Sequence, residues 1–275
     1  MGKGFRSIRW PILLIAAVVT AAHAESATTV RLAVVNTPQF SGLLDDLLPE
    51  FEAKTGLTLE VYSGNDLYQQ ARAGKADIVI SHYGRPEVES FVLEGYGSWP
   101  KIVFANQAVL IGPKSDPAKI RGLSSASEAL SRIARAKAPF ITNSSKGAGY
   151  LTSILWESAG RPDKGDWFLE TNRVNVASAL LAEEKRGYFI WGAWPFLRFT
   201  SQRESDLEML VFADPLLQRS MAAVIVSPHK IQGVNVEGAT ALRDYLLSPR
   251  IQAKIAAFRS PWSDKPLWWP AGRDN

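Results

Sequence analysis

The sequence contains no cysteine and only three histidines among its 275 residues. Without cysteine the chain can form no disulfide, no thiolate metal site and no acylated lipoprotein terminus. HExxH, EF-hand and GxSxG motifs are also lacking, and Gly147 and Gly149 belong to no complete phosphate-binding glycine loop. These absences argue against hydrolytic, metal-dependent and nucleotide-dependent enzymes. We therefore predict that the protein has no catalytic residues, no metal and no cofactor.

Long apolar runs are equally scarce. The most prominent run covers residues 11–19 and is too short for a membrane-spanning helix, which needs about 20 residues. Three basic residues precede it and Ala22-His23-Ala24 follows it, an order typical of an export signal. A membrane anchor is the alternative, and the short run disfavours it. We predict a signal peptide over residues 1–24, cleavage after Ala24, and a free, exported protein in the periplasm.

An excess of one charge is also missing from most of the chain. The sequence has 31 Lys and Arg against 27 Asp and Glu, a formal net charge of +4. Because the predicted signal peptide carries three basic residues and no acidic one, the mature chain is closer to neutral. Nucleic acid and anionic membrane surfaces therefore have no electrostatic support as partners.

The sequence does contain an alternation of strand-like and helix-like periods. The first part predicts strands at residues 30–35, 57–62 and 76–81 and helices at 41–54, 66–73 and 86–94. The middle part predicts strands at 139–142, 188–191 and 208–213 and helices at 125–137, 148–158 and 177–186. Two further helices, at 236–247 and 249–258, follow. Such βαβ alternation is typical of parallel sheets with helical crossovers.

Two extended segments connect these parts. Residues 100–113 carry the chain out of the first part, and a strand at 221–227 returns it. We predict an α/β protein with two lobes joined by two crossing segments. Lobe 1 comprises residues 25–108 and 222–275, and lobe 2 comprises residues 109–221.

Two strand-to-helix junctions are candidates for a ligand site. One contains Asn36 and Thr37, and the other contains Ser145, Lys146 and Gly147. Helix N-termini offer free backbone N–H groups and a partial positive charge, and open α/β sheets bind ligands at the carboxyl ends of their strands. Ordinary helix capping by these residues is the alternative.

Several segments also carry a family resemblance. They are SGLLDDLLPEFEAKTG (41–56), ARAGKADIVISH (71–82), VLEGYG (92–97), IGPKSDPAKI (111–120), APFITNSS (138–145), WFLET (167–171) and LWWP (267–270). With these segments the chain resembles the periplasmic solute-binding proteins of tungstate-type ABC importers, a branch of the type II binding proteins. The resemblance implies two lobes that close on an oxyanion and deliver it to a membrane permease. We expect a monomer whose partners are a small-molecule or oxyanion ligand and the membrane permease.

The chain departs from this family where the ligand is expected. Relatives carry a Thr-Asp-Arg-Gly-Thr-Tyr segment whose Arg is expected to neutralise the oxyanion, and here Ala193 takes the place of that Arg. The Thr/Ser-rich turn after the first strand keeps a single hydroxyl, that of Thr37. The second-lobe Asp-Ser-Gly-Thr-His loop is replaced by KGAGY (146–150). These changes argue against simple inheritance of tungstate specificity.

Other residues can replace the lost interactions. Lys146 and Arg173 can restore positive charge, and Trp191 and Trp194 can either stack on an organic group or belong to the core. His82 and Tyr83 stand at the end of the third predicted strand. We expect a structural role for His82 and a place in the pocket for Tyr83.

We predict a small anionic ligand, either an oxyanion or a small organic anion. The alternatives are a tungstate- or molybdate-binding protein proper and a sensory module that docks on a membrane receptor.

Overall fold

The computed structural model describes residues 28–212, 214–259 and 266–271. The predicted signal peptide, residues 1–24, lies outside the described residues. None of the described helices is long and apolar enough to cross a membrane.

Lobe 1 is built around three parallel strands. Its elements are β1 (Thr29–Val34), α2 (Asn36–Phe40), α3 (Leu43–Thr55), β2 (Thr58–Ser63), α4 (Leu67–Arg72), β3 (Ile78–His82), α5 (Pro86–Leu93), α10 (Val236–Leu247), α11 (Pro249–Ala257) and β10 (Trp268–Pro270). Strand β1 pairs in parallel with β2 and β3, as the βαβαβ pattern predicted. The buried leucines at positions 43, 44, 47 and 48 and Phe51 form the apolar face of α3, because helical spacing of three and four residues places them on one side.

Lobe 2 has its own small sheets and helices. Its elements are α6 (Ala126–Arg135), β5 (Phe140–Ile141), α7 (Lys146–Ser158), β6 (Phe168–Leu169), α8 (Val176–Lys185), β7 (Phe189–Gly192), α9 (Ala193–Ser201), β8 (Leu207–Val211) and the short 3-10 helix η1 (Pro215–Leu217). The sequence patterns did not predict α2, β6, α9, η1 or β10. Two of these, α2 and α9, contain a proline within the first three residues, where a helix tolerates it because the missing N–H has no partner inside the helix.

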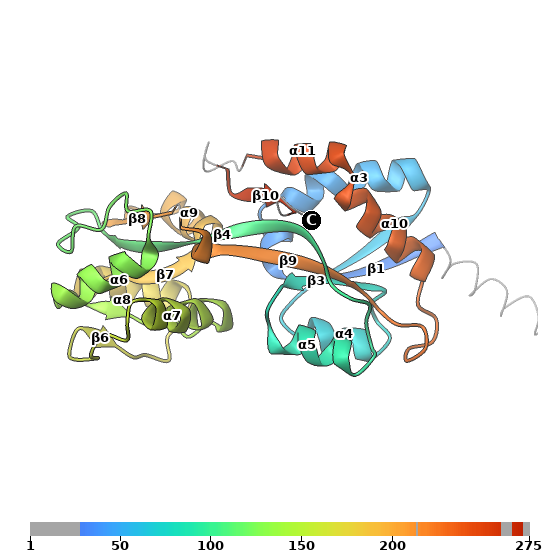
Figure 1. Cartoon of the computed structure of the whole chain (residues 1–275). Coiled ribbons are helices and arrows are strands. Elements are labelled where there is room, and N and C mark those ends of the chain that lie inside the picture. The colour runs from blue at the N-terminus through green and yellow to red at the C-terminus, as the bar shows by residue number, and fades with distance from the viewer. Residues whose placement is uncertain (1–27, 213, 260–265, 272–275) are drawn as a thin grey trace, which may run out of the picture.

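Two long strands, β4 (Lys101–Pro113) and β9 (Gln218–Ile225), run between the lobes (Figure 1). In lobe 1, β9 pairs antiparallel with β3 and β4, and β4 also pairs with β10. In lobe 2, β4 pairs with β7 and β8. The pairing of β4 with β9 reaches Gln107, and its pairing with β7 begins at Ala108. The proposed division at 108/109 and 221/222 therefore falls inside the two connecting strands.

A buried ion pair fixes the outer end of β1 in lobe 1. The Asp77 side chain is fully buried and accepts hydrogen bonds from Arg31 N, Nε and Nη2 at 2.7, 3.0 and 2.6 Å. It also accepts one from the Asn235 backbone N–H at 2.9 Å, just before α10. This carboxylate therefore ties together β1, the start of β3 and the start of α10.

Candidate functional site

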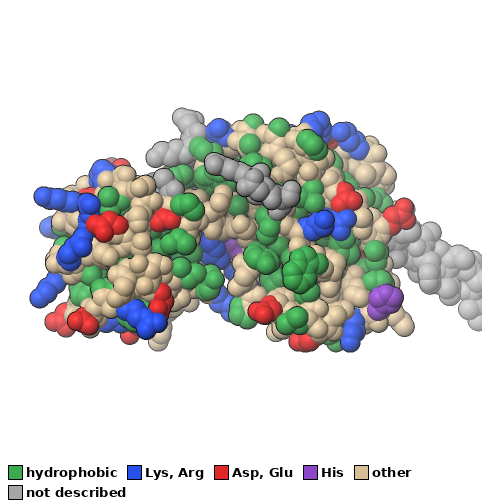
Figure 2. Space-filling view, viewed as in Figure 1, with side chains coloured by type: hydrophobic (Ala, Val, Ile, Leu, Met, Phe, Trp, Pro, Cys, Tyr) green, Lys and Arg blue, Asp and Glu red, His purple; other side chains and the backbone are tan. Residues whose placement is uncertain are grey.

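A cleft of about 600 Å³ lies between the two lobes. Its walls come from helices α2, α7 and α9, from strands β3 and β7, from Arg85 just before α5, from the loop before α8, and from the two connecting strands. Space-filling atoms of Lys or Arg and of His are visible inside the hollow between the lobes (Figure 2). The carboxyl end of β1 leads directly into this cleft, which is where open α/β sheets bind ligands.

The lobe 1 wall begins at the start of α2. Asn36 and Thr37 lie in its first turn and line the cleft. Their side chains hydrogen-bond to no other described residue, so their polar groups remain available to a ligand. Phe40, at the end of this helix, also lines the cleft, although its side chain remains 52% exposed.

The lobe 2 wall is organised by Asn143, which is almost completely buried. Its Oδ1 accepts hydrogen bonds from the backbone N–H groups of Ser145 and Asn175, at 3.2 and 3.1 Å. Its Nδ2 donates to the Ile190 carbonyl at 3.2 Å. One amide therefore joins the N-terminus of α7, the loop before α8 and strand β7.

Two tryptophans form the aromatic part of this wall. Trp191 and Trp194 are 6% and 5% exposed, belong to the hydrophobic core, and line the cleft. Trp191 Nε1 donates to Asn175 Oδ1 at 3.1 Å, which fixes the orientation of its ring. The alternatives of core and cleft are therefore not exclusive, because both side chains pack on the core from one side and border the cleft on the other.

The main positive charges of the cleft come from Arg85 and Arg219, which the sequence patterns did not single out. Arg85 follows β3 and Arg219 lies in β9, and both residues are partly buried. Neither forms an ion pair with a described residue, and Arg85 Nε is buried without a described hydrogen-bond partner. No Asp or Glu occurs among the described residues that line the cleft.

Burial disfavours the charged form of both guanidinium groups. Desolvation, with the nearby charge of Arg85, lowers the pKa of Arg219 to about 10. Desolvation also lowers the pKa of Arg85, and Glu87 and Tyr68 only partly oppose it. Both residues nevertheless remain charged at neutral pH. They form a site of concentrated positive charge inside the protein.

A glycine permits Arg219 to reach a hydrogen-bond acceptor in the backbone of α7. Arg219 Nη1 donates to the Gly147 carbonyl at 3.0 Å. A Cβ on residue 147 would lie 2.9 Å from the same nitrogen, so a larger residue would push the guanidinium away. Gly147, from one of the two predicted junctions, thus contributes by allowing close approach.

His82 lies beside these arginines and is neutral. Burial and the charges of Arg219 and Arg85 hold its pKa well below the ordinary value. A side-chain hydrogen bond with Asn106, another cleft residue, only partly opposes this lowering of the pKa. A neutral imidazole and an amide therefore add polar groups to the cleft without adding charge.

Lys146 lines the cleft, but its ammonium group is engaged. Its Nζ forms an ion pair at 2.6 Å with Glu87 Oε1, at the start of α5 in the other lobe. This hydrogen bond lowers the pKa of Glu87. The ammonium group of Lys146, which was predicted to bind the ligand, therefore forms a contact between the two lobes instead.

The structure brings most of the predicted site residues together. Eight of them line the cleft: Asn36, Thr37, His82, Ser145, Lys146, Gly147, Trp191 and Trp194. Two do not: the side chain of Tyr83 is 54% exposed, and Arg173 is exposed beside the cleft residues Val174 and Asn175. Ala193 is fully buried at the start of α9, so that position supplies no cation. Arg85 follows the carboxyl end of β3, and this position was the signal that could have identified it.

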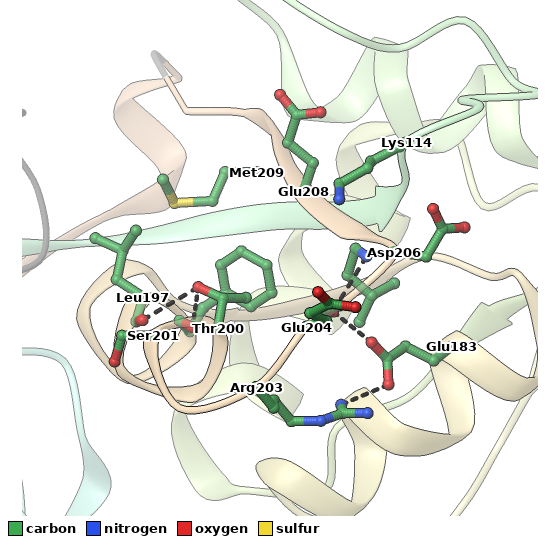
Figure 3. A pocket seen from close by; sticks show the side chains of 13 residues that line it. Lys114, Glu183, Leu197, Thr200, Ser201, Arg203, Glu204, Asp206, Glu208 and Met209 are labelled. Carbon is green, nitrogen blue, oxygen red and sulfur yellow. Dashed lines mark hydrogen bonds and ion pairs between the residues drawn. The ribbon is translucent and has the colours of Figure 1, made fainter.

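A second hollow, of about 930 Å³, lies on the outside of lobe 2 (Figure 3). Glu183, Glu204, Asp206 and Glu208 line it. Arg203 and Ser205 hydrogen-bond to Glu183. This acidic surface is a poor match for an anion. Among the described residues, no group of three or more His, Asp or Glu side chains is placed to hold a metal ion.

Comparison with known proteins agrees with this architecture. Residues 32–258 match the family of bacterial extracellular solute-binding proteins. The chain belongs to this family. The predicted fold class, two α/β lobes joined by two crossing segments with a cleft between them, is confirmed.

Individual relatives carry more specific names. The solute-binding protein is 28% identical to the tungstate-binding protein TupA of Peptoclostridium acidaminophilum, over 90% of this chain and 87% of the relative. It is 30% identical to a putative ABC transporter anion-binding protein of Haloferax volcanii, over 89% of this chain and 72% of the relative. The solved structure of the tungstate-binding protein TupA from Desulfovibrio alaskensis G20 superposes with a TM-score of 0.79 at 27% identity, covering 89% of this chain and 99% of that chain.

Proposed function

We propose that this protein is the periplasmic solute-binding component of an ABC importer and that it captures a small anion between its lobes. The observation that carries the proposal is the pair of partly buried arginines, Arg85 and Arg219, in a cleft whose described lining holds no carboxylate. A buried cation is costly when it has no partner, and a bound anion would offset that cost. The names of two relatives, one tungstate-binding and one anion-binding, support the same ligand charge.

The other parts of the proposal follow from this role. Export would remove residues 1–24, and the mature monomer would pass its cargo to a membrane permease without performing chemistry on it. Tungstate or molybdate is the second candidate ligand, because relatives at 27–28% identity are named for tungstate. Ala193 argues against tight binding of these ions, because the family's arginine is missing at that position.

A thermal-shift panel on the mature protein tests the proposal. The compounds are tungstate, molybdate, sulfate, methylphosphonate and acetate, with glucose and choline as neutral and cationic controls. A ligand at 100 times its dissociation constant stabilises the folded state by about 2.7 kcal/mol, which corresponds to a rise in melting temperature of roughly 5–10 °C. We expect anions to give such a rise and the controls to give none. Stabilisation by glucose or choline, with none by any anion, would contradict the proposal.

A further inference from the structure

The volume of the cleft exceeds that of a bare tetrahedral oxyanion. Four oxygens around one small atom occupy about the space of three water molecules, roughly 90 Å³. The cleft measures about 600 Å³, within the range of about 300–1,000 Å³ that is common for organic ligands.

This volume belongs to a conformation in which the lobes are already in contact. Lys146 of lobe 2 and Glu87 of lobe 1 form their ion pair at 2.6 Å. This exposed ion pair joins the two lobes beside the cleft, and a single oxyanion would leave most of the cleft to water.

The cleft also presents apolar surface from both lobes. Phe40 lies on the lobe 1 side and Val174 on the lobe 2 side, and their side chains are 52% and 45% exposed. Trp191, Trp194 and Pro195 extend this apolar wall. An oxyanion has no apolar surface with which to cover these side chains, whereas a hydrocarbon or aromatic group does.

The charge of the site points to an anion with two negative charges. Arg85 and Arg219 come from different elements, and each offers a planar fork of donors to a carboxylate or phosphonate group. Among the described residues, no carboxylate pairs with either of them. Two cations beside an aromatic wall favour a ligand that has both features.

We infer that the cargo is an organic dianion that carries an apolar group, such as an aromatic phosphonate or dicarboxylate. This inference rests on the proposed function, because it specifies the class of anion that the importer takes. The anionic group would bind at Arg85 and Arg219, and the apolar group would lie against Trp194 and Phe40.

Calorimetry with a matched pair of probes tests the inference. Methylphosphonate and phenylphosphonate share the same anionic group and differ in the apolar one. We expect phenylphosphonate to bind at least tenfold more tightly than methylphosphonate, and also more tightly than tungstate. The variant Phe40→Ala should remove most of this preference, because it should weaken phenylphosphonate binding far more than methylphosphonate binding. Because Phe40 is half exposed, this variant should fold, and its melting temperature without ligand checks that it does.

Each outcome separates the inference from the proposed function. Equal affinity for both phosphonates, or tighter binding of tungstate, would overturn the organic cargo and leave the anion-binding function intact. A preference for phenylphosphonate that Phe40→Ala and Trp194→Leu both leave unchanged would also overturn it, since the apolar group would then bind elsewhere. Failure of every anion to bind would overturn both the inference and the proposed function.

Discussion

Replacement of Arg219 by Gln should weaken anion binding without lowering the stability of the empty protein. Burial and the charge of Arg85 lower the pKa of Arg219 to about 10, more than two pKa units below the ordinary value of an arginine. At 1.36 kcal/mol per unit, the charged group is disfavoured by about 3 kcal/mol relative to water. A neutral glutamine avoids this cost.

The substitution also removes an interaction. Arg219 Nη1 donates to the Gly147 carbonyl at 3.0 Å, and a hydrogen bond to a charged group contributes about 1.5–3 kcal/mol. The two effects are similar in size, so we expect the free energy of unfolding of Arg219→Gln without ligand to stay within about 1 kcal/mol of the wild-type value. Loss of one charge-assisted contact should reduce affinity for an anion by about ten- to a hundredfold.

Urea unfolding of the empty protein and calorimetry with methylphosphonate measure these two quantities. Arg121→Gln is the matched control, because Arg121 is an exposed arginine that pairs with Glu208 on the outside of lobe 2 and its loss changes the net charge equally. We expect this control to bind normally. A fall in stability of more than 2 kcal/mol for Arg219→Gln, with affinity unchanged, would refute the reasoning and make Arg219 a structural residue.

Three further predictions concern stability. Asp77→Ala should lower the free energy of unfolding by about 3 kcal/mol. This value is near the low end for a broken buried ion pair, because the Arg31 side chain is 28% exposed. A loss under about 1 kcal/mol in urea unfolding would contradict this prediction. Asn143→Ala should cost about 2 kcal/mol, because two backbone N–H groups and one carbonyl lose their partner; an unchanged urea midpoint would contradict this. Burial keeps the pKa of His82 in the folded protein well below its ordinary value. As the pH falls below about 6.5, only the unfolded chain therefore takes up a proton at His82. The contribution of His82 to the free energy of unfolding is intact above this pH and declines below it. Denaturation curves above and below this pH should show a smaller decline for His82→Asn, and an equal decline would exclude His82 as the source.

Periodicity in the sequence was sufficient for most of the fold. The apolar stripe of residues 43–51 predicts the buried face of α3, and the β-branched run of residues 30–35 predicts strand β1. Both patterns are local in the sequence. Helix α9 was missed because its nine residues carry Trp, Pro and Phe at the start, a composition that predicts a loop. Strand β10 has only three residues and owes its conformation to pairing with β4.

The chemistry of the cleft was harder to predict than its location. The junctions at Asn36 and Ser145 follow strands, and the rule for carboxyl ends of strands places them correctly in the cleft. Arg85 and Arg219 are far apart in the sequence and meet only because β3 and β9 pair in the fold. The sequence predicted that Lys146 binds the ligand. Its partner in the structure, Glu87, lies in the other lobe, and local sequence patterns do not reveal such a contact.

Anomalous diffraction from crystals soaked with millimolar tungstate tests the central claim most directly. Tungstate serves here as a heavy dianion that marks the anion position, whatever the natural cargo is. The account predicts one dominant peak within hydrogen-bond distance of Arg85 and Arg219, inside the cleft between the lobes. A dominant peak elsewhere, for example at the exposed Arg173, with none beside Arg85 and Arg219, would contradict it.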